Sequence, residues 1–190
     1  MRAHRRVGTP DTRTDAELLA AHRSGDPAAF GELAVRYRQT LWGIAVHTLG
    51  DPDDAADAVQ EALVAAYRRA GTYRGESAVR TWLSRIVVNA CIDRIRRDRV
   101  RRTVPWPERE MPARRSDPAV EVVNRLAVAE ALALLPVQQR VAVVLVDVHG
   151  CPVAEAAAIL GVPHGTVKSR CARGRARLAV LLGHLREAER

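Results

Sequence analysis

The sequence predicts an all-α protein with two small helical domains, joined by a linker rich in proline and arginine. Apolar residues recur at helical spacing through most of the 190 residues, and no useful stretch alternates as a strand would. Asp-Pro pairs occur where new helices would begin, because Asp caps a helix and Pro suits its first position. Four prolines between Val100 and Pro118 indicate a linker. The predicted segments are a disordered basic tail at 1–13, a first domain at 14–102, the linker at 103–116 and a second domain at 117–190.

The first domain is predicted to contain four helices. Thr14 to Glu17 has the pattern of a capping box and begins the first helix. Gly50 ends the second helix, because glycine suits the residue after a helix end. The other signals place helix starts at Asp26-Pro27, Asp51-Pro52 and about Ser77, helix ends at about Ala70 and Arg102, and a loop at Gly71 to Ser77.

The second domain is predicted to begin with a helix capped by Asp117-Pro118 that ends near Leu135-Pro136. A further helix is expected to end at Gly150, with one apolar face formed by Val141, Val144, Leu145 and Val148. Pro152 to Leu160 then predicts a short alanine-rich helix, which Gly161-Val162-Pro163 interrupts.

The next segment, His164 to Leu178, has the pattern of a DNA-recognition helix. It contains five Lys or Arg residues and no acidic one. At about 100° per residue, Val167, Cys171, Gly174 and Leu178 share one side, and Thr166, Ser169, Arg170, Arg173 and Arg177 lie on the other. Helix, glycine-containing turn and basic helix is the order of a helix-turn-helix, whose arginines can donate two hydrogen bonds to guanine. A merely solvated basic face is the alternative.

Composition favours a nucleic-acid partner. The formal net charge is +8, and aromatic residues are only 4%, which argues against an RNA module built on stacking aromatics. Cys91, Cys151 and Cys171 lack metal-ligand spacing and are expected to be small core residues in a reducing compartment. No signal peptide or bilayer-spanning run is recognisable, so a cytoplasmic protein without membrane insertion is expected.

Three features of the first domain need a functional explanation. The stretch from Asp51 to Glu61 has five acids and no base, which suits a helix start but also a basic protein partner. Tyr73 and Arg74 lie in a loop that could contact an unstacked base. On the long helix, Asn89 could contact a base edge, whereas core packing is the better explanation for Trp82. Arg94 to Arg102 contains six arginines, either a solubilising helix end or a phosphate-binding surface.

Taken together, these motifs resemble those of bacterial RNA polymerase sigma factors of the sigma-70 family, extracytoplasmic-function (ECF) group. The stretch DAADAVQEALVAAYRRAGTYRGESAVRTWLSRIVVNACIDRIRR is similar to region 2 of that family. The stretch LPVQQRVAVVLVDVHGCPVAEAAAILGVPHGTVKSRCARGRARL is similar to region 4. The resemblance implies a promoter-specificity subunit without catalytic residues, metal, cofactor or small-molecule substrate. Its expected role is transcription initiation in a stress response.

The resemblance also implies partners. These are promoter DNA, the largest-subunit coiled coil and the flap of core RNA polymerase, and an anti-sigma factor. The implied −35-binding residues are Thr166, Lys168, Ser169, Arg170, Arg173 and Arg177. The implied −10-binding residues are Tyr73, Arg74, Trp82, Asn89, Asp93, Arg94, Arg96 and Arg97. The implied polymerase-binding residues are Asp57, Gln60 and Glu61.

The sequence departs from the family pattern at two cysteines, and two other functions compete with the resemblance. Cys151 stands where the family usually has a capping Ser, which predicts a weaker helix start, and Cys171 replaces a usual Leu. A DNA-binding regulator with a ligand-sensing domain would explain neither the acidic patch nor the arginine run. A nuclease would need His or carboxylates clustered near the basic surface, whereas the six His are scattered.

Overall fold

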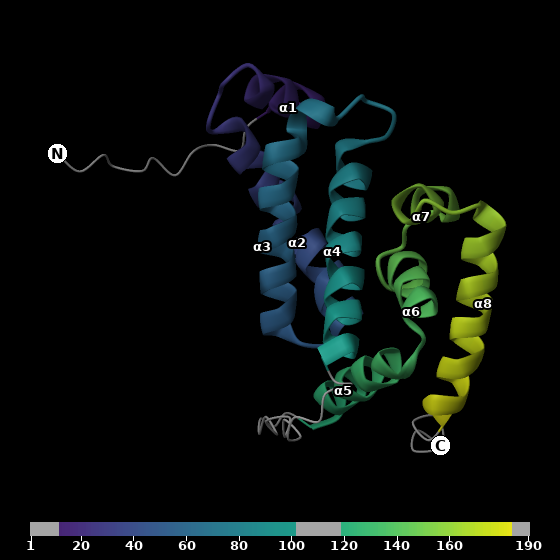
Figure 1. The fold of residues 1–190 in the computed structure, drawn as a ribbon. Helices are drawn as coiled ribbons and strands as arrows, with labels where there is room; N and C mark the ends of the chain where they lie inside the picture. The colour runs from purple at the N-terminus through teal and green to yellow at the C-terminus, as the bar shows by residue number, and fades with distance from the viewer. Residues whose placement is uncertain (1–11, 102–118, 184–190) are drawn as a thin grey trace.

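A computed structural model describes residues 12–101 and 119–183, and its regular elements there are all helical, which confirms the predicted class (Figure 1). The first unit contains α1 (Asp15–Arg23), α2 (Ala29–Leu49), α3 (Pro52–Arg69), the 3₁₀ turn η1 (Ala70–Thr72) and α4 (Val79–Arg101). The second unit contains α5 (Ala119–Leu134), α6 (Val137–Val143), the π-helical turn η2 (Val144–Val148), α7 (Val153–Leu160) and α8 (His164–Leu181). The linker 103–116, the Asp117-Pro118 cap and most of the basic tail lie outside the described residues.

The helix boundaries of the first unit follow from local hydrogen bonds. Thr14 caps α1 in a reciprocal capping box with Glu17, as predicted. Asp51 caps α3 by accepting the N–H groups of Asp53 and Asp54 at 2.8 and 2.9 Å, and Gly50 ends α2 with φ +81°. The start of α2 was predicted too early, because Asp26 accepts the N–H of Ala28 in a turn before the helix begins.

The second unit contains one feature that the sequence did not predict. After α6 the chain widens into the π turn η2, where the N–H of His149 bonds to the carbonyl of Val144 at 3.0 Å. The extra residue per turn changes the helical register. Val148 is therefore 42% exposed, and its predicted place on the buried face with Val141, Val144 and Leu145 is wrong.

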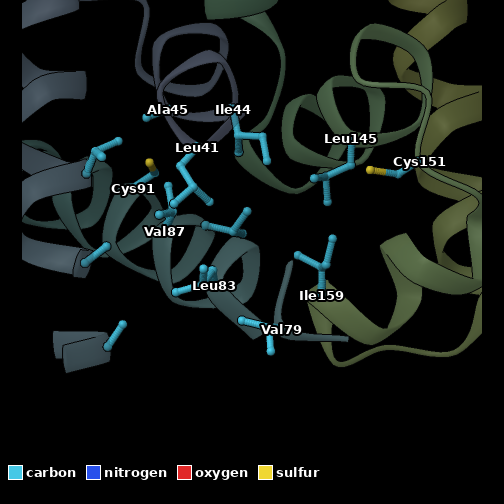
Figure 2. Packing of buried hydrophobic residues seen from close by; sticks show 14 of the residues in the cluster. Leu41, Ile44, Ala45, Val79, Leu83, Val87, Cys91, Leu145, Cys151 and Ile159 are labelled. Carbon is cyan, nitrogen blue, oxygen red and sulfur yellow. The ribbon is translucent and has the colours of Figure 1, made fainter. Parts of the chain in front are cut away.

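The two units pack against each other and share one hydrophobic core. Leu83 and Val79 of α4 belong to the same buried cluster as Leu145, Cys151 and Ile159 of the second unit. Figure 2 shows these side chains facing each other. We call this boundary, where α2 and α4 meet α5, α6, η2 and α7, the inter-unit interface. The hydrophobic pattern predicted the buried faces of single helices, but gave no indication of this contact.

Polar contacts reinforce the interface at both ends. Arg140 of α6 is buried and donates to the carbonyl of Thr48 at 2.8 Å, at the end of α2. The same guanidinium donates to the carbonyls of Ala133 and Leu135, where α5 ends. Farther along, Glu155 of α7 accepts from Thr81 at 3.2 Å and lies 3.6 Å from the guanidinium of Arg80.

Candidate nucleic-acid interface

The helix-turn-helix forms as predicted. Gly161 ends α7 in the left-handed conformation, with φ +64°, and the turn to Pro163 leads into α8. Val167, Cys171 and Gly174 of α8 are buried, and Leu178 packs on the second core cluster. The apolar side of the basic helix therefore faces α6 and α7, and its other side is left for a partner.

Gly174 brings α8 unusually close to α6. A Cβ atom at this position would lie 2.6 Å from Cγ2 of Val143. Arg175 forms a two-point ion pair with Asp147, at 2.7 and 3.1 Å, which further joins α8 to η2. One of the five basic residues of α8 therefore has a structural contact within the unit.

The predicted −35-binding residues form the outward side of α8. Lys168, Arg173 and Arg177 are exposed, whereas Thr166, Ser169 and Arg170 are half-buried. Arg173 donates through Nε to the carbonyl of Ser169 at 3.2 Å, and its Nη2 lies 3.3 Å from the hydroxyl of Ser169. These contacts hold the guanidinium along the helix surface.

On α4, the structure presents four of the predicted −10-binding residues on the exposed surface: Asn89, Asp93, Arg96 and Arg97. Trp82 is half-buried and packs against the core, which agrees with the packing explanation. Asp93 lies 3.5 Å from Arg96 in an exposed ion pair, so the charge of this arginine is partly balanced within the helix.

The loop between η1 and α4 forms a pocket. The ring of Tyr73 packs on Trp82 with centroids 5.4 Å apart, and its hydroxyl donates to the carbonyl of Ser77. Tyr73 and Arg74 line a pocket of about 480 Å³ together with Arg23 of α1. Sequence reasoning missed Arg23, because only the packing of α1 on η1 brings it to the loop.

Arg94 is placed differently from the other predicted −10-binding residues. It points toward α3, where Nη2 lies 2.6 Å from Asp54 and 3.2 Å from Asp57. Burial is the largest single effect and lowers the pKa of Arg94. The hydrogen bonds and charges of Asp54 and Asp57 together outweigh burial, so the pKa is raised. In this conformation Arg94 joins α4 to α3 and is engaged by acids rather than presented to phosphate.

Asp57, Gln60 and Glu61 are exposed on one side of α3, as a partner-binding role requires. Glu61 lies 3.6 Å from Arg97, in a pair too exposed to contribute much stability. An apolar groove of about 620 Å³ between α2 and α3 adjoins Gln60. Sequence reasoning missed this groove, whose lining includes the exposed side chains of Val35, Trp42, Val64 and Tyr67.

The three cysteines are free and buried, as predicted. Burial raises the pKa of Cys91 to about 12 and raises the pKa of Cys151 and of Cys171. The expectation that Cys151 would act as a poor helix cap is wrong, because α7 begins after Pro152 and the thiol packs in the shared core. Among the described residues no three His, Cys, Asp or Glu side chains are grouped to hold a metal.

The described helices include none with both the length and the apolar character that a membrane span requires.

Comparison with known proteins agrees with this geometry. The family model Sigma-70 region 2 matches residues 33–101, and the model Sigma-70, region 4 matches residues 125–178. The ECF RNA polymerase sigma factor SigM of Mycobacterium tuberculosis strain H37Rv is 51% identical over 173 residues, which cover 91% of this chain and 87% of that protein. The ECF RNA polymerase sigma-E factor of Escherichia coli K12 is 32% identical over 177 residues, covering 85% and 91%.

Solved structures of similar fold are also found. The structure of CnrH in complex with the cytosolic domain of CnrY has a TM-score of 0.69 at 31% identity, covering 90% of this chain and 97% of that chain. The sigma factor RpoE of Bartonella quintana, solved with the anti-sigma factor NepR, has a TM-score of 0.67 at 27% identity, covering 82% and 98%. With its region 2 and region 4 folds, the chain belongs to the ECF RNA polymerase sigma factors of the sigma-70 family.

Proposed function

We propose that the protein binds core RNA polymerase and directs it to promoters by recognising a −35 and a −10 element. The observation that carries this proposal is the division of α8 into a buried apolar side and an exposed basic side within a helix-turn-helix. Lys168, Arg173 and Arg177 are exposed and would face the major groove of a −35 element, while α7 crosses the backbone. Thr166, Ser169 and Arg170 complete the proposed contact.

The −10 element is proposed to bind the first unit as an opened strand. The pocket beside Tyr73 could hold an unstacked base between an aromatic ring and the side chains of Arg23 and Arg74, which offsets the cost of unpairing. Asn89 can offer both a donor and an acceptor to a neighbouring base edge. Arg96 and Arg97 then lie on the same helix to neutralise phosphates.

Polymerase is proposed to bind α3 and the adjoining groove. Asp57, Gln60 and Glu61 provide the charge, and the groove provides an apolar surface that a partner helix could cover. A second polymerase contact, with the flap, is proposed on the second unit. Leu134 of α5 is 69% exposed and Val180 of α8 is 82% exposed, on two helices that pack together.

Control by an anti-sigma factor is the regulatory part of the proposal, in keeping with a stress response. Its support is that a relative of similar fold, RpoE of Bartonella quintana, was solved with the anti-sigma factor NepR. A second neighbour, CnrH, was also solved with a protein partner, the cytosolic domain of CnrY.

Promoter binding also requires the two units to separate. Elements centred at −35 and −10 are roughly 25 base pairs apart, or about 85 Å at about 3.4 Å per base pair. Here α4 and α8 both pack on α7, so at interaxial distances of about 8–10 Å their axes are at most about 16–20 Å apart where they meet α7. The structure therefore corresponds to a closed form of the protein.

The polymerase contact is tested with fluorescently labelled protein and core enzyme. The double variant Asp57→Asn, Glu61→Gln is expected to weaken core binding at least about tenfold, since it removes two charges from the proposed contact. Asp53→Asn, a neutralisation in the first turn of the same helix, is the matched control. Equal affinities for the double variant and the control would place the polymerase contact elsewhere. Tight DNA binding without any core binding would favour a plain regulator.

A further inference from the structure

His149 lies at the inter-unit interface in a position that leaves little room for change. Its ring approaches Gly43 of α2 so closely that a Cβ atom there would lie 2.8 Å from Cε1 of His149. The Nε2 atom of His149 is buried and has no hydrogen-bond partner among the described residues. A side chain of the second unit is therefore inserted into a notch that only glycine leaves open on the first.

The surroundings of this ring are basic. His47 of α2 lies beside it, with ring centroids 5.6 Å apart, and Nδ1 of His47 bonds to the carbonyl of Gly43 at 2.7 Å. Arg80 of α4 is the next cation, and Arg140 of α6 holds the carbonyl of Thr48, one residue beyond His47.

The neighbouring acids already have partners. Glu155 of α7 is engaged by Arg80 and Thr81, and Asp147 of η2 itself is paired with Arg175. Burial of the Cys151 thiol raises its pKa and keeps it neutral. A proton added at the buried Nε2 atom of this half-buried ring would thus meet the positive charge of Arg80 and acids that are already engaged.

Burial lowers the pKa of His149, and repulsion from His47 and Arg80 adds to this, against the opposing effect of the nearby Gly43 backbone. Once the units separate, the ring should return toward the ordinary pKa of about 6.5. The open form therefore takes up a proton at a higher pH than the closed form. The free-energy advantage of the closed form over the open form is complete above about pH 6.5. It is lost as the pH falls further, because only the open form then binds the proton readily.

We propose that His149 is a proton-operated latch between the two units: the neutral ring holds the protein closed, and its protonation opens the interface. The latch is a property of the protein alone. Only its consequence, release of the two promoter-binding surfaces on acidification, rests on the proposed function.

Hydrogen exchange of the full-length protein at pH 7.5 and 5.5 tests the latch without polymerase or DNA. After correction for intrinsic exchange rates, peptides spanning Val144–Cys151 report the opening of the interface, and peptides of α3 serve as an internal reference. If the closed form excludes the proton, the opening equilibrium constant should rise about tenfold at pH 5.5, one unit below the ordinary histidine pKa. Peptides of α3 should not show this rise.

Variants assign the effect to the ring. His149→Gln cannot be protonated and should remove the pH response, whereas His164→Gln, on the exposed start of α8, should keep it. If His149→Gln also loses protection in α3, that variant destabilises more than the interface. His149→Phe is then used in its place, because phenylalanine keeps a ring of similar size and cannot be protonated. Equal corrected protection of the wild-type interface at both pH values would overturn the proposal, as would a variant at position 149 that still responds to pH. Because the readout needs no promoter, failure of the latch is distinguishable from failure of the proposed function.

Discussion

At the scale of single residues, Arg140 shows how one buried guanidinium can satisfy two helix ends. Its donors reach carbonyls at the end of α2 and at the end of α5, which lie far apart in the sequence. Burial lowers the pKa of Arg140, with no carboxylate among its described hydrogen-bond partners to compensate. The partial negative charge of helix C-termini favours the cation at this position.

Arg140→Ala should therefore be among the most destabilising substitutions. It leaves buried carbonyls without donors, at an expected cost of about 3 kcal/mol in the free energy of unfolding. Urea denaturation at pH 7.5 measures this, with the exposed Arg173→Ala as a control expected to change stability by less than about 0.5 kcal/mol. A loss below about 1 kcal/mol for Arg140→Ala would mean that water replaces the guanidinium easily.

Gly174 gives a second residue-scale prediction. Gly174→Ala should destabilise the protein by about 1–3 kcal/mol, because the new methyl group would overlap Val143 across the α6–α8 contact. Gly165→Ala, on the same helix but with nothing within 4 Å, is the matched control and should be neutral or slightly stabilising. Thermal unfolding of the two variants checks the difference. Equal melting temperatures would contradict the close packing.

At the scale of elements, the sequence was informative where the signals are local. Capping residues, glycines at helix ends and hydrophobic period predicted the starts of α1, α3, α4, α7 and α8 to within about two residues. The π turn η2 was missed, because its wider hydrogen bonding has no distinct residue pattern. The ion pairs of Arg94 were not predicted either, since its partners Asp54 and Asp57 come from a different helix. The pocket beside Tyr73 and the groove beside Gln60 both depend on pairs of helices.

The recognition helix α8 carries the main element-scale prediction. Arg173→Ala should weaken binding to a −35 duplex by about 1–3 kcal/mol relative to a scrambled duplex. Arg175→Ala removes the same charge from the same helix, but its guanidinium is engaged by Asp147, so discrimination between the two duplexes should be retained. Fluorescence anisotropy at one fixed salt concentration measures both variants. Unchanged discrimination by Arg173→Ala would remove this arginine from the −35 contact.

At the scale of the whole molecule, the closed arrangement is the main result that no local pattern predicted. The hydrophobic residues of α4 and α7 look like the faces of separate bundles in the sequence, but they form one core (Figure 2). The long-range contacts by which Thr81 and Arg140 meet the other unit likewise follow from tertiary structure alone. Opening this core must cost free energy, which polymerase and promoter contacts would have to offset.

A cross-link across the interface tests whether opening is required. In the double variant Thr81→Cys, Glu155→Cys, the two native side chains lie 3.2 Å apart between Oγ1 and Oε1, so a short bifunctional thiol reagent should join them. The cross-linked protein should lose promoter-dependent transcription, and the same variant before cross-linking should keep it. The native cysteines are buried and should react slowly. Full transcription by the cross-linked protein would show that the closed form is competent.

The most direct test of the proposed function is transcription in vitro with core RNA polymerase and a library of genomic promoters, with and without the protein. If the protein directs initiation, transcripts should appear only when it is added. They should start downstream of a shared two-part motif and be lost with the Asp57→Asn, Glu61→Gln variant. No stimulation by a protein that still binds duplex DNA would contradict a role in initiation.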